Sequence, residues 1–201
     1  DKSIRFGFAA ISGIGDGAAD EIVMEREKNG PFQDIFDFVK RINFSNVNSK
    51  CVENLINSGG FDCFGLPREQ YNAITAKGEP FFKQLINFGQ QYQQAMKEAQ
   101  DDLFGGLNGV EIPNPKFPPF EEMSHIQKLN IEKSLIGLYL SAHPLDEYRV
   151  VLENLCNGHP SDFGREVNRE ELAKRSPLKI GGIVTNVRTG FSRRGDPCGF
   201  V

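Results

Sequence analysis

The sequence predicts a mostly α-helical chain that ends in a short β hairpin. Apolar residues recur at helical spacing through most of the chain, and glycines or prolines separate the predicted helices. Near the end of the chain, apolar residues instead alternate with small or polar ones, which is typical of strands. These observations favour a bundle of helices followed by a small β element.

Three short helices are predicted in the first 65 residues. The first covers residues 16–28 and ends before a Gly-Pro pair. Apolar residues at helical spacing between Phe32 and Ile42 indicate the second. The third covers residues 49–58, with Asn48 as its N-cap and Gly59 as its terminating residue.

The middle of the chain contains one long helix and one linker. Residues 79–99 are rich in Gln and carry an apolar stripe, which predicts an amphipathic helix. Residues 101–119 contain seven Gly or Pro residues, too many for regular structure, and are predicted to form an exposed linker.

Two further helices and two strands are predicted after this linker. The helices cover residues 124–141 and 145–156, and Pro144 is placed to open the second. The strands are expected at 180–187 and 198–201. Two strands do not make a stable sheet alone, so this end either packs on the helices or is poorly ordered.

Composition limits the possible functions. The 201 residues carry a formal net charge of -4, so any contact with DNA must be local. The apolar runs are far shorter than a membrane span, and no leader opens the chain, which predicts a cytoplasmic protein without a membrane partner. The four cysteines and three histidines are not spaced as metal ligands, and no disulfide framework is expected. Both ends look cut, which predicts a segment of a longer protein.

A helix-hairpin-helix pattern lies at Gly13-Ile14-Gly15. The two glycines allow a sharp turn, Ile14 is expected to plug the core, and Ala19 and Ile22 are expected to pack the second helix on the first. Backbone N–H groups that begin the second helix, including that of Gly17, then favour a DNA phosphate. The alternative is that the glycines only form a tight turn between helices.

The charge around this hairpin leaves the strength of DNA binding open. Residues 1–65 carry seven basic and ten acidic side chains. Five basic residues could form a local basic edge or simply a solvated face: Lys2, Arg5, Lys40, Arg41 and Lys50. Residues 47–64 end in two glycines and could be a degenerate second hairpin with a structural role.

The peptide Gln100-Asp101-Asp102-Leu103-Phe104 carries two adjacent apolar side chains beside the linker. They could anchor in a groove of a partner, with Gln100 supplying orienting hydrogen bonds, or fold back onto their own domain. Asp101 and Asp102 are adjacent and lack further ligands, so a metal site is not expected there. No nucleophile with its base and no P-loop is present, and no catalytic residue is assigned.

In order and spacing, these features together resemble the C-terminal half of the bacterial replicative DNA polymerase III alpha subunit family. The resemblance covers nearly the whole chain. The residues that carry it are Ile11–Ile22, Gly30-Pro31-Phe32, Phe38, Glu53, Leu55-Ile56, Gly59–Asp62, Gln100–Phe104, Glu132-Lys133, Gly137–Ser141, His143–Leu145 and Gly182–Val184.

The resemblance implies specific partners. It implies a tandem helix-hairpin-helix region in which Gly13, Ile14, Gly15 and Gly17 contact duplex DNA. It implies docking on the β sliding clamp by Gln100, Asp102, Leu103 and Phe104, although Asp101 departs from the apolar residue often found second in such peptides. The final strands resemble the start of a truncated OB-fold, in which Arg188, Arg193 and Arg194 face single-stranded template or are solvated loop charges.

The resemblance also implies five segments and no activity. The segments are 1–66 (hairpin region), 67–99 (Gln-rich helix), 100–119 (clamp peptide and linker), 120–175 (helical connector) and 176–201 (OB-fold strands). The family's catalytic aspartates lie upstream, so this segment of a DNA-directed polymerase, a nucleotidyltransferase, is expected to be inactive. It is expected to need no cofactor, whereas the parent would use Mg²⁺. The alternatives are a segment of a DNA-repair enzyme with helix-hairpin-helix motifs, or a structural connector.

Overall fold

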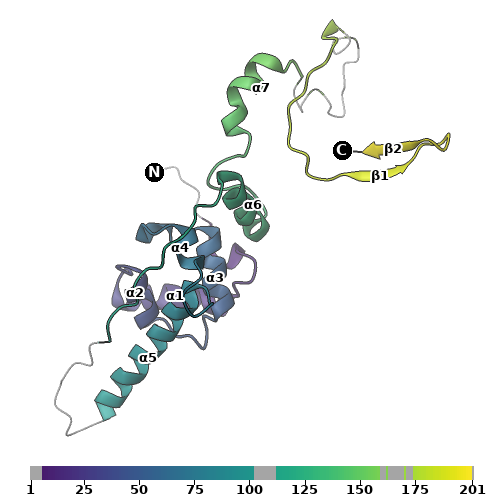
Figure 1. The fold of residues 1–201 in the computed structure, drawn as a ribbon. Helices are drawn as coiled ribbons and strands as arrows, with labels where there is room; N and C mark the ends of the chain where they lie inside the picture. Colours follow the sequence, from purple (N-terminus) through teal and green to yellow (C-terminus); the bar gives the residue numbers. More distant parts are fainter. Residues whose placement is uncertain (1–5, 102–111, 159–161, 163–169, 171–173, 201) are drawn as a thin grey trace. The chain divides into compact units, whose positions relative to one another are not determined.

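A computed structural model of the chain describes residues 6–101, 112–158, 162, 170 and 174–200. The chain divides into two compact units, Asp1–Ser141 and Ala142–Val201. Helices build the first unit, and a two-stranded antiparallel sheet closes the second (Figure 1). The predicted fold class, mostly α with a β hairpin at the end, is therefore confirmed.

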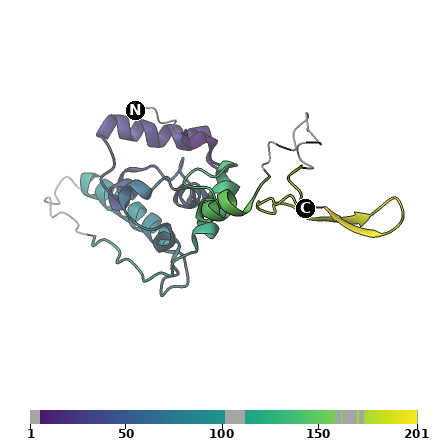
Figure 2. The ribbon, with the colours of Figure 1, turned by 90° about the horizontal axis from the view of Figure 1, so that it is seen from above.

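The first unit consists of six α-helices and two short 3-10 helices among its described residues. In chain order they are η1 (Phe8–Ala10), α1 (Asp16–Asn29), α2 (Ile35–Arg41), α3 (Ser49–Ser58), η2 (Asp62–Phe64), α4 (Arg68–Asn72), α5 (Phe81–Asp101) and α6 (His125–Ile136). Figure 2 shows α1 running across one side of the bundle that the other helices form.

The core lies where α2, α3 and α4 meet the first half of α5. Its fully buried side chains are Ile35, Phe38, Val39, Ile42, Val47, Val52, Leu55, Ile56, Tyr71, Phe81 and Leu85. At the crossing of α2 and α5, a Cβ on Gly89 would lie closer to the Val39 carbonyl oxygen than any real contact allows. Glycine at this position therefore lets the two helices approach closely. Residues 96–99 of α5 are exposed, so the end of this helix leaves the core.

The helix ends follow the predicted capping residues closely. Asn48 caps α3 by accepting a hydrogen bond from the Cys51 N–H at 3.0 Å. Gly59 ends α3, and the Gly60 N–H donates to the Leu55 carbonyl at 2.7 Å, which closes the helix in a Schellman pattern. The glycines of segment 47–64 thus have a structural role.

The short helix α4 was not predicted, and α6 is shorter than expected. Helix α6 was predicted to cover residues 124–141, but it ends at Ile136 because Gly137 adopts a left-handed conformation. At its start, Ser124 and Gln127 form a reciprocal capping box.

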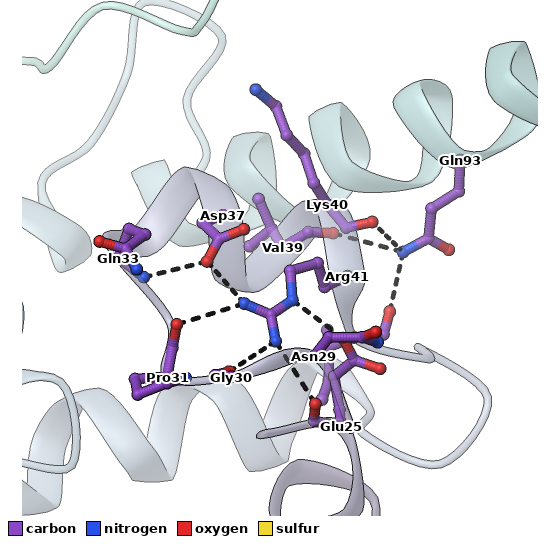
Figure 3. Close-up of polar contacts among 11 residues, drawn as sticks. Glu25, Asn29, Gly30, Pro31, Gln33, Asp37, Val39, Lys40, Arg41 and Gln93 are labelled. Atoms are coloured by element: carbon purple, nitrogen blue, oxygen red, sulfur yellow. Dashed lines mark hydrogen bonds and ion pairs between the residues drawn. The ribbon is translucent and has the colours of Figure 1, made fainter. Parts of the chain in front are cut away.

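Arg41 lies at the centre of a polar cluster that ties the end of α1 to α2 (Figure 3). Its guanidinium donates to the Glu25 carboxylate at 2.9 Å and to the Asp37 carboxylate at 2.8 Å. A third bond, also 2.8 Å, reaches the Gly30 carbonyl at the end of α1. The Arg41 side chain is only 18% exposed, so it does not serve the basic edge considered from the sequence.

The charges of this cluster stabilise one another. Partial burial alone would raise the pKa of the Glu25 carboxyl, but hydrogen bonds from Arg41 and Asn29 outweigh it and hold this pKa below its ordinary value. Glu25 therefore remains a carboxylate beside Arg41 at neutral pH. Removing either partner would leave the other charge partly buried without compensation.

Gln93 gives α5 a polar link to the end of α2. Its side-chain amide donates to the Ile42 carbonyl at 2.8 Å and to the Lys40 carbonyl at 3.2 Å (Figure 3). These carbonyls at the end of a helix have no partners within it. Gln93 therefore satisfies the end of α2 and fixes the register of α5 against it.

Residues 112–124 run without regular secondary structure along the helices of the first unit. The ring of Phe117 packs against the rings of Phe36 and Phe81, with centroids 5.4 and 5.5 Å away. The Met123 N–H donates to the buried Glu69 carboxylate at 3.1 Å. This half of the predicted linker is therefore anchored to the bundle.

The second unit contains η3 (Asp146–Tyr148), α7 (Arg149–Leu155), β1 (Arg188–Phe191) and β2 (Pro197–Phe200) among its described residues. The strands pair in antiparallel register, with Arg188 opposite Phe200 and Phe191 opposite Pro197. The predicted helix at 145–156 thus begins with a 3-10 turn and becomes α-helical only at Arg149.

The first strand lies later in the chain than predicted. Residues 180–187 have no strand partner among the described residues, so they form no strand despite their alternating pattern. A turn sets the hairpin instead: the Ser192 N–H donates to the Asp196 carbonyl at 2.8 Å, and Gly195 has a φ of 85°. This turn pairs the residues directly on either side of it.

We predict that Arg41→Met destabilises the first unit by about 2 kcal/mol, because it leaves Glu25 and Asp37 without their shared partner. Urea unfolding followed by circular dichroism measures this change. Lys50→Met is the matched control, because Lys50 is exposed and its ion pair is with Glu53, within the same helix α3. Equal stability of the Arg41 and Lys50 variants would contradict the central role of Arg41.

Candidate nucleic-acid interface

The predicted hairpin forms a tight turn between η1 and α1. The Ile14 N–H donates to the Ile11 carbonyl at 3.1 Å, and Gly13 has a φ of 78°, the combination found in a type II turn. Gly15 is extended and immediately precedes the first residue of α1. The sequence pattern at 13–15 therefore corresponds to a real turn with a helix starting from it.

Apolar side chains fix the turn to the bundle beneath it. Ile14 is 5% exposed and Ile11 is 7% exposed, so both side chains are buried in the core, as the pattern predicts for Ile14. On α1, Ala18 and Ile22 are buried, and Ala19 is partly buried against the same core. The backbone of the turn is left at the surface, because Gly13, Gly15 and Gly17 are all exposed.

Backbone donors without protein partners collect at the start of α1. Within the part of the chain that the structure describes, the N–H groups of Gly15, Asp16 and Gly17 donate to no acceptor, whereas that of Ala18 donates to the Gly15 carbonyl. The 14 residues of α1 direct the positive end of their dipole to this point. Unpaired N–H groups at the start of a helix are suited to a phosphate.

The candidate residues divide into two roles. The Ile14 side chain is buried and its N–H is used inside the turn, so Ile14 shapes the turn. Gly15 and Gly17 present free N–H groups and open space in front of their Cα atoms. Asp16 introduces a carboxylate into the first turn of α1, which opposes an anionic ligand.

The proposed basic edge does not form among its described members. Lys40 lies over the rings of Phe88 and Tyr92, and Lys50 pairs with Glu53. Arg41 is inside the cluster described above. Lys2 and Arg5 lie outside the described residues. Among the described residues, backbone donors and not a basic patch are thus the main attraction for an anion at the hairpin.

Asn54 contacts the hairpin, although it was not among the site residues predicted from the sequence. Its side-chain amide, on α3, donates to the Ser12 carbonyl at 2.7 Å, and Asn54 is 3% exposed. The signal in the sequence is a polar residue on the apolar face of a helix, between Val52 and Leu55.

The other predicted site residues lie in two places. Gln100 and Asp101 are the last residues of α5, while Asp102, Leu103 and Phe104 lie outside the described residues. Arg193 and Arg194 are exposed in the turn between β1 and β2, and Arg188 begins β1 at the other end of the hairpin. Arg193 and Arg194, which are adjacent in the sequence, thus lie together in the turn, and Arg188 lies apart from them.

The described residues contain no group of three His, Cys, Asp or Glu side chains that could hold a metal ion. None of their helices is long and apolar enough to cross a membrane.

Comparison with known proteins agrees with this geometry. Residues 1–71 match the family described as the helix-hairpin-helix motif, which confirms the predicted motif. Along nearly its whole length, the chain is similar to proteins named DNA polymerase III subunit alpha. It is 28% identical to that of Pseudomonas aeruginosa over 100% of the chain, 35% to that of Chlamydia pneumoniae over 96%, and 30% to that of Aquifex aeolicus over 98%. The chain spans only 17%, 15% and 14% of the length of these three relatives.

We predict that Gly13→Ala destabilises the first unit by about 2 kcal/mol, because a side chain is strained at positive φ. Its Cβ would also lie only 2.5 Å from the Asn54 amide nitrogen. Gly17→Ala is the matched control, since a Cβ there meets open space within a helix. Thermal unfolding of both variants tests this, and an unchanged melting temperature for Gly13→Ala would contradict the turn geometry.

Proposed function

The chain belongs to the family of bacterial DNA polymerase III alpha subunits, and we propose that it is a non-catalytic segment that holds duplex DNA and docks on the sliding clamp. One observation carries the DNA part of this proposal: a helix-hairpin-helix turn presents unpaired backbone N–H groups at the start of α1. On this proposal, nucleotidyl transfer and its Mg²⁺ belong to the rest of the parent protein.

The hairpin binds DNA through its phosphates. Neutral N–H groups and a helix dipole attract a phosphate without reading bases, so binding is independent of sequence. The acidic balance of residues 1–65 supplies no long-range attraction and weakens the contact. A modest grip of this kind suits a polymerase segment, because duplex DNA must move past it after every nucleotide added.

The clamp part of the proposal rests on the peptide 100–104 and on its position. Residues 96–99 of α5 are exposed, so the peptide begins at the end of a helix that has left the core. Gln100, Leu103 and Phe104 supply one polar and two apolar contacts for a groove on the clamp, and Asp102 completes the peptide. The Asp at position 101 keeps the affinity modest.

Two weak attachments together give processive synthesis. A polymerase held to a clamp that encircles DNA stays at high effective concentration beside the primer end, so dissociation from DNA is followed by rebinding. The arginines of the β1–β2 hairpin, with Arg193 and Arg194 at its tip, provide a third contact, to single-stranded template.

We predict that Asp16→Pro binds a labelled mixed-sequence duplex about fivefold more weakly than Asp16→Ser, because both variants lose the carboxylate but only the proline variant loses a free N–H donor. Proline is tolerated as the first residue of a helix, and Gly15 already has the extended conformation that must precede it (φ -79°, ψ 161°). Fluorescence anisotropy with the whole chain measures the change.

Asp16→Ser is the matched control for this variant. It removes the same carboxylate but keeps the N–H, so we expect its affinity for the duplex to equal or exceed that of the wild type. Equal affinities for the proline and serine variants would exclude the Asp16 N–H as a phosphate ligand.

We predict that replacing both Leu103 and Phe104 with alanine abolishes binding to the cognate β clamp, which we expect at about micromolar strength in the wild type. Titration calorimetry measures it. The control replaces Leu138 and Leu140, which are 40% and 47% exposed outside the peptide, and should leave binding intact. Clamp binding by the Leu103/Phe104 variant at wild-type strength would refute the assignment of the peptide.

A further inference from the structure

Both polar backbone atoms of Ser12, directly before the turn, are bound by other helices. The Ser12 N–H donates to the Leu135 carbonyl near the end of α6 at 2.8 Å. The Ser12 carbonyl accepts from the Asn54 side chain of α3 at 2.7 Å. Ser12 is therefore fixed between two helices that lie far from it in the sequence.

The two bonds differ in what they require of the sequence. Leu135 contributes a backbone carbonyl from the last turn of α6, which has no partner within its helix and which any residue could supply. Asn54 contributes a side chain, and its amide is the only described side-chain nitrogen or oxygen that bonds to the backbone of residues 11–17. The bond to the Ser12 carbonyl therefore depends on the identity of residue 54, whereas the bond to the Ser12 N–H does not depend on the identity of residue 135.

Asn54 also fits closely under the next residue. A Cβ on Gly13 would lie 2.5 Å from the Asn54 amide nitrogen, so glycine at 13 and asparagine at 54 form a matched pair. The Cys51 thiol, one turn earlier on α3, adds a weak contact to the Gly13 carbonyl at 3.5 Å. Together these contacts hold the carbonyl side of the turn against α3.

This matters for the free N–H groups, because they begin only three residues after Ser12. Asn54 is buried, so the donor side of its part-buried bond to Ser12 is shielded from competing water. A turn that is held in its binding geometry before the ligand arrives loses little freedom on binding. A turn without this bond would have to be ordered by the phosphate itself.

We infer that Asn54 is a positioning residue for the phosphate-binding turn, an inference that rests on the proposed DNA-binding function. It touches no phosphate. It acts through the Ser12 carbonyl and the Gly13 backbone, which it holds in front of the unpaired N–H groups of Gly15, Asp16 and Gly17 at the start of α1.

The test separates this role from a general contribution to stability. Asn54→Ala removes the amide, and Asn54→Asp keeps its size but removes the donor. Val52→Ala is the matched control: Val52 is 1% exposed on the same helix, and its truncation destabilises the bundle but removes no hydrogen bond to the turn, because the valine side chain has no polar atom. Duplex affinity of each full chain is measured by anisotropy well below its melting temperature, and folding is verified by circular dichroism.

We expect Asn54→Ala and Asn54→Asp to weaken duplex binding about fivefold, and Val52→Ala to change it less than twofold even when its melting temperature falls further. Two results would overturn the inference while leaving the proposed function intact. One is wild-type affinity in either Asn54 variant. The other is a loss of affinity in Val52→Ala that matches theirs. Failure of the wild-type chain to bind the duplex would overturn the proposed DNA-binding function and this inference with it.

Discussion

The positive φ of Gly13 is the constraint on which the proposed interface depends. It reverses the chain between η1 and α1, so that Ile11 and Ile14 enter the core while the start of α1 remains at the surface. The same glycine allows α3 to approach so closely that the Asn54 amide reaches the Ser12 carbonyl. The reversal of the chain, the burial of Ile11 and Ile14 and the exposure of the N–H groups therefore all depend on the backbone conformation of Gly13.

The distribution of charge explains how an acidic segment can still be suited to DNA. Basic side chains that might have formed a patch are used inside the bundle: Arg41 joins α1 to α2, and Lys40 covers aromatic rings of α5. The remaining attraction at the hairpin comes from neutral N–H groups and a helix dipole. These act only at short range, so they favour a local contact with the backbone over tight, long-range capture.

The sequence was enough to predict the helix ends and the turn that depend only on a few neighbouring residues. The N-cap at Asn48, the end of α3 at Gly59 and the turn at 13–15 each depend on a few adjacent residues. The prediction of a strand at 180–187 was wrong, because a strand needs a partner and periodicity alone does not show which residues will pair. The early end of α6 reflects a single glycine inside an otherwise helical pattern.

The role of Asn54 and the inward position of Arg41 could not be predicted, because both depend on contacts between distant segments. Ser12 and Asn54 lie 42 residues apart, and Arg41 reaches Glu25 across 16. A polar residue on an apolar face or a charge near a helix end hints at such contacts but does not identify the partner. Only the packing of α3 against the turn identifies the partner of Asn54, and only the packing of α2 against α1 identifies that of Arg41.

Titration of the isotopically labelled chain with a mixed-sequence duplex, followed by the amide resonances in two-dimensional NMR, tests the central claim most directly. If the turn binds a phosphate, the amide signals of Gly15 and Gly17 shift saturably with added DNA and are among the most affected. If those two signals stay in place while resonances elsewhere in the chain shift, the helix-hairpin-helix turn does not bind the DNA backbone.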